Sequence, residues 1–222
     1  MQRLRVTFAK TAAMKYTGHL DTHLAWERTF RRADLPLAYS QGYHRQPKIQ
    51  LAAALPLGFT SECEVADIWL EAARPLDAVC AALTTVAPPG LQVLQVGEAP
   101  LDAAPLQALM RSARYRVDVI SPLSPAAVDA RLADLLSQTA VPRVRRDKAY
   151  DLRPLIEALT RLTSAETTHT LSMQLAAREG ATGRPEEVVE ALGFSAAEAR
   201  YHRLQLLWAE RAQGGQPLEQ PQ

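Results

Sequence analysis

The chain has 222 residues, a formal net charge of +1, 47% hydrophobic residues and 22% charged residues. These values are typical of a globular protein with one large domain or two small ones. Its apolar runs, such as residues 51–57, are far shorter than the ~20 residues that a membrane helix needs, and the N-terminus shows no apolar signal core. We therefore expect a cytoplasmic protein with no membrane partner.

Charge is distributed unevenly along the chain. Residues 1–50 contain nine Lys/Arg and three Asp/Glu, a balance of +6, whereas residues 51–108 contain one Arg and seven Asp/Glu, a balance of −6. A segment of this kind can present a basic face to phosphates even when the net charge is near zero. Strands that interleave in a sheet can equally disperse the same charges.

The first half of the chain predicts the element order β-α-β-β-α-β. Alternation of polar and apolar residues predicts a strand over residues 3–9, and apolar residues at helical spacing predict a helix over residues 18–33. The predicted core face of that helix consists of Leu20, His23, Trp26, Phe30 and Ala33. The elements that follow are a polar loop over residues 39–48, strands over 49–55 and 62–71, a helix opened by Pro75, and a strand over 91–96.

The second half of the chain repeats this order. It predicts strands over residues 115–120 and 168–175, helices over 125–138 and 185–192, a strand or mixed segment over 150–160, and a strand over 201–208 that a helix could replace. We therefore predict an α+β fold of two tandem ferredoxin-like (βαββαβ) modules with antiparallel sheets. The predicted domains are residues 1–97, with a motif-rich segment over 10–59, a linker over 98–110, a second module over 111–210, and a disordered tail over 211–222.

Two cysteines, Cys63 and Cys80, are the only ones in the chain. Their separation matches no CxxC motif, which argues against an iron–sulfur cluster or a Cys-rich zinc site within this chain. We expect two buried free thiols, no metal and no cofactor.

The segment from Gly18 to Asp21 falls at the predicted start of a helix. Backbone N–H groups are unpaired there and attract anions, so that His19 and the nearby Lys15 are candidates for a phosphate site. The alternative is structural: Asp21 favours the helix dipole, and His19 caps the helix or packs in the core.

The predicted loop over residues 39–48 combines aromatic, basic and glycine residues. Tyrosine rings can stack on bases while Arg and Lys neutralise phosphates, as recognition of single-stranded RNA requires. The same loop is also explained as a long connection whose tyrosines anchor it to the core. A second basic stretch, residues 143–148, is either a solvated loop or a contact with a phosphate backbone.

Weak catalytic candidates also lie in the first module. A ribonuclease could use His19 as base and His44 or Tyr43 as acid if the two histidines converge. His23 lies on the predicted apolar face and is interpreted as a core residue. No motif of a metalloprotease, a P-loop NTPase, a dinucleotide-binding enzyme or a GxSxG hydrolase occurs.

Several motifs resemble the radical-SAM-linked uncharacterised protein family. The run from Gly18 to Tyr43 is similar to that family's S-H-L-D and F-E-R-A-L-R-R-A-x-L-P-x-A-Y-S-x-G-F, and residues 47–49 and 55–58 are similar to its P-x-I-S-F and P-L-P-L-G. Arg145-Arg146-Asp147-Lys148 and residues 151–156 resemble its basic segment and its D-I-R-P-x-I motif. The chain departs from the family at Gly18, where the family has Ser, and at Gln46, where it has His.

The resemblance implies a partner radical SAM enzyme, fused to the chain or encoded beside it, and it carries no established activity. Because this chain lacks the cluster cysteines, it would be the accessory half. A looser likeness, of fold plan only, is to CRISPR repeat-processing ribonucleases.

Three hypotheses follow. The first is an accessory RNA-binding or substrate-presenting module that acts with the radical SAM enzyme; the second is a metal-independent endoribonuclease that uses His19 and His44; the third is a protein-docking module with no nucleic-acid role. The predicted nucleic-acid-binding residues are Lys15, His19, Arg28, Arg31, Arg32, Tyr39, Tyr43, Arg45, Lys48, Arg145, Arg146 and Lys148.

Overall fold

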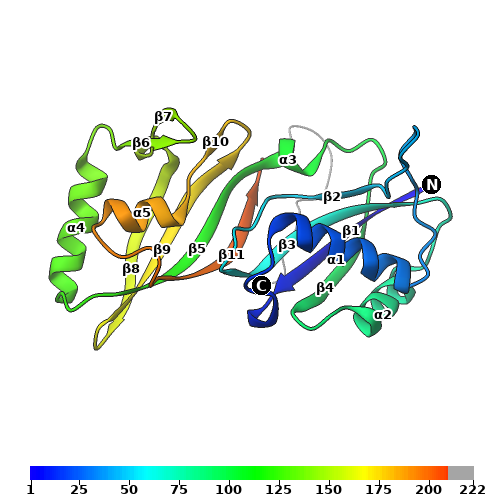
Figure 1. Ribbon diagram of the computed structural model, residues 1–222, viewed down its shortest axis with the longest axis horizontal. Helices are drawn as coiled ribbons and strands as arrows, with labels where there is room; N and C mark the ends of the chain where they lie inside the picture. Colours follow the sequence, from blue (N-terminus) through cyan, green and yellow to red (C-terminus); the bar gives the residue numbers. More distant parts are fainter. Residues whose placement is uncertain (210–222) are drawn as a thin grey trace. The chain divides into compact units, whose positions relative to one another are not determined.

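The computed structural model describes residues 1–209, so the tail predicted over residues 211–222 lies outside the described residues. The chain divides into two compact units, residues 1–110 and the residues from Arg111 onward, which run from blue to green and from green to orange in Figure 1. Each unit combines helices with antiparallel strands, which confirms the predicted α+β class. Within residues 1–209, no helix has the length and apolar character required to span a membrane.

The first unit is built around a four-stranded antiparallel sheet. Its elements are β1 (Gln2–Lys10), α1 (His19–Arg32), β2 (Ile49–Leu51), β3 (Phe59–Leu70), α2 (Leu76–Val86), β4 (Leu91–Ala99) and the short α3 (Leu106–Leu109), with a 3-10 turn at Ala12–Met14. The hydrogen-bonded strand order is β4-β1-β3-β2, in which β1 lies between β4 and β3. Strands β3 and β4 are longer than predicted, whereas β2 is shorter.

Alternation along β1 decides which face of this sheet becomes the core. Leu4, Val6 and Phe8 are buried on one face, against α1 and α2. The Trp26 ring of α1 meets the Phe8 ring edge-on at 4.8 Å and stacks on the Phe30 ring at 4.9 Å. Offset and edge-on pairs of this kind add to the stability that apolar burial provides.

The buried face of α1 differs from the predicted one. Leu20 is 81% exposed and His23 is half-buried, whereas Thr22 and Thr29 are buried beside Trp26. Each threonine hydroxyl donates to the carbonyl oxygen four residues earlier, so the polar group is satisfied and the methyl group can pack. The apolar periodicity was therefore a poor guide here, because it counted Leu20 and missed the two threonines.

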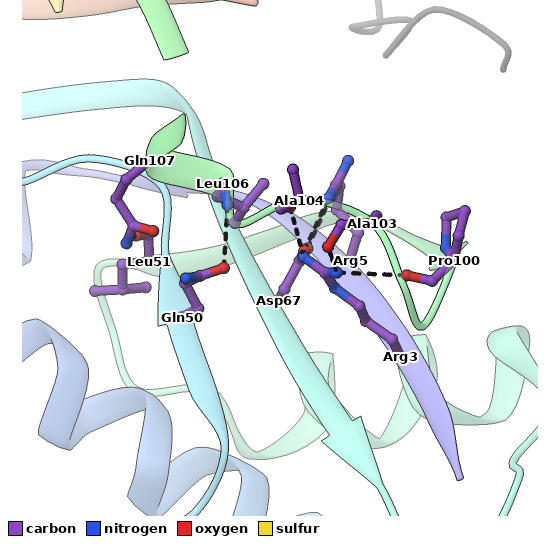
Figure 2. Close-up of polar contacts among 10 residues, drawn as sticks. All are labelled: Arg3, Arg5, Gln50, Leu51, Asp67, Pro100, Ala103, Ala104, Leu106 and Gln107. Atoms are coloured by element: carbon purple, nitrogen blue, oxygen red, sulfur yellow. Dashed lines mark hydrogen bonds and ion pairs between the residues drawn. The ribbon is translucent and has the colours of Figure 1, made fainter. Parts of the chain in front are cut away.

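The opposite face of the sheet carries a buried charge cluster, drawn in Figure 2. Asp67 of β3 is 0% exposed and accepts hydrogen bonds from Arg3 Nε at 2.9 Å and from Arg5 Nε and Nη2 at 2.7 and 2.8 Å. The Arg3 guanidinium also lies over the Trp69 ring, at 4.7 Å from its centroid. Paired charges of this kind can remain in an interior only when their polar atoms are bonded.

Arg3 also holds the segment that covers this face. Its Nη atoms donate to the carbonyl oxygens of Pro100, Ala103 and Ala104. Figure 2 shows a second attachment, in which the side chain of Gln50 accepts from the backbone N–H of Leu106, at the start of α3. The stretch predicted as a linker over residues 98–110 thus contains the end of β4, a turn and α3, and it packs on the first unit.

The second unit follows a similar plan. Its elements are β5 (Met110–Ile120), α4 (Pro125–Ser137), β6 (Pro142–Arg145), β7 (Lys148–Asp151), a 3-10 turn (Arg153–Leu155), β8 (Ile156–Ala165), β9 (Thr168–Arg178), β10 (Ala181–Thr182), α5 (Pro185–Ala191) and β11 (Arg200–Trp208). Strands β8, β9, β5 and β11 are neighbours in that order, β10 extends the β8 edge of β9, and β6 and β7 form a separate hairpin. The segment 201–208 is a strand, which settles the alternative that the sequence left open.

We predict that Asp67→Asn weakens the first unit severely. The substitution leaves Arg3 and Arg5 without a counter-charge in a buried site, and breaking such a cluster typically costs about 3–5 kcal/mol. The free energy of unfolding, measured with a chemical denaturant, is expected to fall by about that amount. Glu71→Gln, at an exposed position just beyond β3, is the control and should change it by less than about 0.5 kcal/mol; equal effects of the two substitutions would contradict the assignment.

Candidate nucleic-acid interface

The last two turns of α1 carry three exposed arginines. Arg31 forms an ion pair with Glu27 at 2.7 Å, whereas neither Arg28 nor Arg32 pairs with a carboxylate within residues 1–209. Cations near a helix C-terminus stabilise the helix through its dipole, which gives these residues a structural reason to be present. Two of the three nevertheless leave their charge available to a ligand.

The predicted loop over residues 39–48 is a small hairpin whose base is closed by hydrogen bonds. Tyr39 and Pro47 form an isolated antiparallel bridge. The Ser40 backbone N–H donates to the Gln46 carbonyl oxygen at 2.8 Å, and the Ser40 hydroxyl accepts from the Gln46 N–H at 3.0 Å. This closure fixes the base of the loop, so that its outer residues extend from an ordered support.

The outer residues of this loop face solvent. The Tyr43 side chain is 97% exposed, and its ring meets the His44 ring edge-on at 5.1 Å. Arg45 and Lys48 are exposed as well, and Gly42 has φ 121°, a backbone conformation that favours glycine. The alternative that these tyrosines anchor the loop holds for the half-buried Tyr39 but not for Tyr43.

The helix end and the loop lie at the same end of the first unit. After α1, Leu37 bridges to Leu70, at the end of β3, and the Lys48 N–H bonds back to the Ala38 carbonyl oxygen. The structure therefore places seven of the predicted residues at this end of the unit, on the last turns of α1 and on the loop, and we call them the loop site: Arg28, Arg31, Arg32, Tyr39, Tyr43, Arg45 and Lys48.

Lys15 and His19 lie at the other end of the same unit. The Lys15 ammonium is 5.5 Å from the centroid of the exposed Tyr16 ring. His19 lines a small pocket with Lys10, Thr22 and Glu64, which offers about 10 Å³ to a water-sized molecule, close to the volume that one water needs. The Lys10 side chain is 1% exposed and donates to the Thr17 carbonyl oxygen at 2.7 Å.

Lys10 was not among the predicted site residues, although the sequence contained a signal for it. It follows Leu4, Val6 and Phe8 at the same parity of the alternating strand, which directs a lysine to the buried face. A charged residue at such a position is rare unless it is paired. Parity along the strand would therefore have identified Lys10.

His19 and His44, the acid–base pair of the endoribonuclease hypothesis, lie at opposite ends of α1. His19 is the first residue of α1, and the loop that carries His44 follows the last residue of that helix. A helix of 14 residues spans about 20 Å, and α1 separates the two histidines along the sheet. The acid–base pair of the endoribonuclease hypothesis is therefore not assembled.

The basic stretch over residues 143–148 is a two-stranded hairpin rather than a loop. Arg143 is paired with Tyr150 across the strands, and Arg145 with Lys148, so these four side chains share one face. The two-residue turn between the strands is Arg146–Asp147, with φ 48° and 62°. Arg143 was not predicted as a site residue, but its spacing of two from Arg145 places it on the same face.

Glu187, in the first turn of α5, contacts this hairpin, and Glu186 precedes it in the same turn. The Tyr150 hydroxyl donates to the Glu187 carboxylate, and burial together with this bond raises the pKa of Tyr150. Burial likewise raises the pKa of Glu186, whose Oε2 is buried with no hydrogen-bond partner in the described part of the chain. The Glu187 carboxylate beside the basic face is therefore engaged in a hydrogen bond with Tyr150.

No candidate metal centre is found in residues 1–209, where no three His, Cys, Asp or Glu side chains are placed to share an ion. Cys63 is buried and Cys80 is half-buried, and both are free thiols. The expectation of two buried thiols thus applies fully only to Cys63.

Comparisons with known proteins agree with the fold. A family model described as an uncharacterized protein conserved in bacteria (DUF2344) matches residues 3–185. Among solved structures, a chain of the crystal structure of a Cbf5–Nop10–Gar1 complex is 11% identical with a TM-score of 0.52, covering 91% of this chain and 48% of that one. A chain of an archaeal box H/ACA sRNP Nop10–Cbf5 complex is 10% identical with a TM-score of 0.46, covering 90% and 46%.

The chain spans about half the length of these solved chains. At 11% identity, the likeness to the chain of the Cbf5–Nop10–Gar1 complex shows the fold alone. No curated protein matches the chain.

We predict that Glu186→Gln stabilises the protein at neutral pH. A carboxyl whose pKa is raised on folding favours the folded state while it is protonated, and this contribution is lost as the pH rises through the folded-state pKa. The glutamine protein should therefore exceed the parent in unfolding free energy at pH 7.5, by about 1 kcal/mol if one unsatisfied buried group is relieved, and the difference should shrink towards pH 4. Denaturant titrations at the two pH values measure this, with the exposed Glu179→Gln as control; a constant difference would argue against the raised pKa.

Proposed function

The chain belongs to the DUF2344 family, and we propose that it is an accessory RNA-binding or substrate-presenting module that acts with a radical SAM enzyme. The resemblance of its motifs to the radical-SAM-linked family supports the enzyme partner. The arrangement of the loop site supports the RNA, with single-stranded RNA as the class of ligand.

One observation carries the RNA part of this proposal: the Tyr43 ring is 97% exposed at the tip of a pinned loop. An exposed aromatic ring can stack on a nucleobase, because every nucleobase offers a flat face. Arg45 and Lys48 lie on the same loop, and Arg28 and Arg32 lie at the end of the helix that leads into it. These cations are suited to contact the phosphates on either side of a stacked base.

The arrangement of strands supports a further part of the proposal, that both units are ferredoxin-like modules. Counting the strands in chain order within each unit, and leaving out β6, β7 and β10, both units have the spatial order 4-1-3-2. This is the order of the split-βαβ plan, in which the helices cover one face of the sheet.

A second candidate function is protein docking, which a different surface favours. Tyr16, Leu20, Leu24 and Leu57 are exposed apolar side chains. Leu20 and Leu24 are one helical turn apart on α1, and the Gly58 N–H bonds to the Lys15 carbonyl oxygen, which brings Leu57 close to Tyr16. Exposed apolar residues that gather in this way are typical of a protein-interaction surface, and this one is suited to the radical SAM partner.

We predict that Tyr43→Ala weakens binding of a single-stranded RNA oligonucleotide by about 5- to 150-fold. This range corresponds to the roughly 1–3 kcal/mol that one stacked base contributes. Tyr43→Trp should retain affinity, because a larger ring also stacks. Fluorescence anisotropy at low salt measures the change.

The matched control is Tyr16→Ala, which removes an exposed tyrosine at the other end of the same unit and should bind as the parent does. If the two alanine variants keep the parent's affinity alike, Tyr43 does not stack on RNA. If the parent shows no RNA affinity at low salt, the proposal is wrong as a whole.

We predict for the docking surface that Leu20→Ser with Leu24→Ser abolishes co-purification with a co-expressed radical SAM enzyme of the same host. Both leucines are exposed, so the unfolding free energy should change by less than about 1 kcal/mol. Arg28→Gln with Arg32→Gln alters the basic end of the same helix and should leave the complex intact after nuclease treatment. The opposite pattern, in which only the arginine substitutions release the enzyme, would contradict docking through the leucines.

A further inference from the structure

The β6–β7 hairpin has three features that an isolated hairpin would not be expected to retain together. The first is a cross-strand pair of like charges, Arg145 opposite Lys148. Like charges directly opposite each other destabilise an antiparallel pair. Neither residue forms an ion pair with a carboxylate of residues 1–209 that would offset this repulsion.

The second feature is the turn. Both Arg146 and Asp147 have positive φ, as a two-residue turn of the mirror-image type requires. Asn-Gly would adopt this geometry with less strain, and arginine is among the residues that rarely do. The sequence keeps a cation at the tip although its backbone conformation is strained, and strain of this kind is typical of a functional position.

The third feature is an incompletely bonded guanidinium. The Nε of Arg143 is buried and has no hydrogen-bond partner in the described part of the chain, and its Nη1 bonds only to the adjacent Pro142 carbonyl oxygen at 3.1 Å. Unused donors of this kind cost free energy unless a ligand accepts from them. Arg143 shares the hairpin face with Arg145, Lys148 and Tyr150.

One class of ligand would offset the charge repulsion and accept from the accessible donors of these cations. Phosphate oxygens accept from guanidinium donors and neutralise adjacent cations. A four-residue strand covers about 13 Å. The hairpin carries four cations within and beside its two short strands: Arg143, Arg145, Arg146 and Lys148.

The acids beside the hairpin do not cancel this charge. Glu187 accepts a hydrogen bond from Tyr150, which turns it towards the base of the hairpin, and Asp147 lies in the turn. Asp151, at the end of β7, accepts from the backbone N–H groups of Val141 and Arg153. Four cations therefore face three carboxylates, which leaves the arm with a net charge of +1.

We propose that the β6–β7 hairpin is an arm that binds a chain of phosphates, the backbone of the RNA. This inference rests on the proposed function for its ligand, and it assigns the second unit a role that does not depend on base sequence. The arm holds the backbone, whereas Tyr43 of the first unit stacks on a base.

The test uses the full chain and two probes, inorganic polyphosphate and a single-stranded RNA oligonucleotide. Polyphosphate has no bases, so Tyr43 cannot contribute to its binding by stacking. Arg145→Gln with Lys148→Gln should weaken binding of both probes and lower the slope of log affinity against log salt by about 1.4, the value for two lost contacts to a single strand. The matched control is Arg114→Gln with Arg116→Gln, which removes the same charge from exposed positions on β5 and should preserve the slope.

Lys148→Glu separates function from folding. It replaces the repulsive pair with an attractive one, so the thermal midpoint should stay level or rise while polyphosphate affinity falls. A midpoint that falls together with affinity would show that Lys148 serves the fold, and would overturn the proposal.

The remaining outcomes distinguish this inference from the proposed function. If RNA binding depends on Tyr43 and the two double variants behave alike, the arm is wrong and the proposed function stands. If the hairpin substitutions weaken polyphosphate binding but the parent binds no RNA, the phosphate-chain site stands, and the RNA function is wrong together with the assignment of RNA as the ligand of the arm.

Discussion

The buried carboxylate of Asp67 is the interaction on which the first unit depends. It draws Arg3 and Arg5 onto the face of the sheet opposite the helices, and Arg3 then holds residues 100–104 through their carbonyl oxygens. A strand that begins with two arginines would otherwise need solvent on that face. The ion cluster thus allows residues 100–104 to cover a polar face of the sheet, although three charged groups lose their hydration.

This cluster also changes the meaning of the charge pattern along the chain. The balance of +6 over residues 1–50 counts Arg3, Arg5 and Lys10, which are buried or nearly so and engaged with internal partners. Charge segregation in sequence therefore overstates the basic surface. Among the other cations of this segment, Lys15 precedes α1, and the rest lie towards the end of α1 and on the loop that follows it, where Tyr43 is 97% exposed.

Much of the element order followed from the sequence, because strand alternation and helix starts are local properties. The helix opened by Pro75 and the strand over residues 3–9 were recognisable from a few residues each. Three features were not recognisable for physical reasons. Thr22 and Thr29 are buried because each hydroxyl finds a backbone carbonyl, the 98–110 segment is ordered by a partner about 100 residues away, and the 142–151 hairpin lacks the Gly or Asn that would mark its turn.

The candidate sites were harder to predict than the fold, because proximity in sequence does not determine proximity in space. His19 and His44 are 25 residues apart in a motif-rich segment, yet a helix of about 20 Å lies between them. Conversely, Arg28 and Tyr43 belong to separate motifs, and the bridge from Leu37 to Leu70 brings their elements to one end of the unit. The direction of α1 relative to β1 determines both the separation of the two histidines and the shared end of Arg28 and Tyr43. Sequence motifs contain no information on that direction.

The same reasoning explains why an aromatic side chain, rather than the number of cations, carries the functional argument. Exposed arginines at a helix C-terminus have a structural role through the dipole, and one exposed ion pair contributes only ~0–1 kcal/mol. Neither reason applies to Tyr43, which neither packs against the core nor stabilises a helix end and is almost wholly in water. Under the proposed function a base stacks on this ring, and the hydrogen bonds between Ser40 and Gln46 at the base of the loop hold the ring in place.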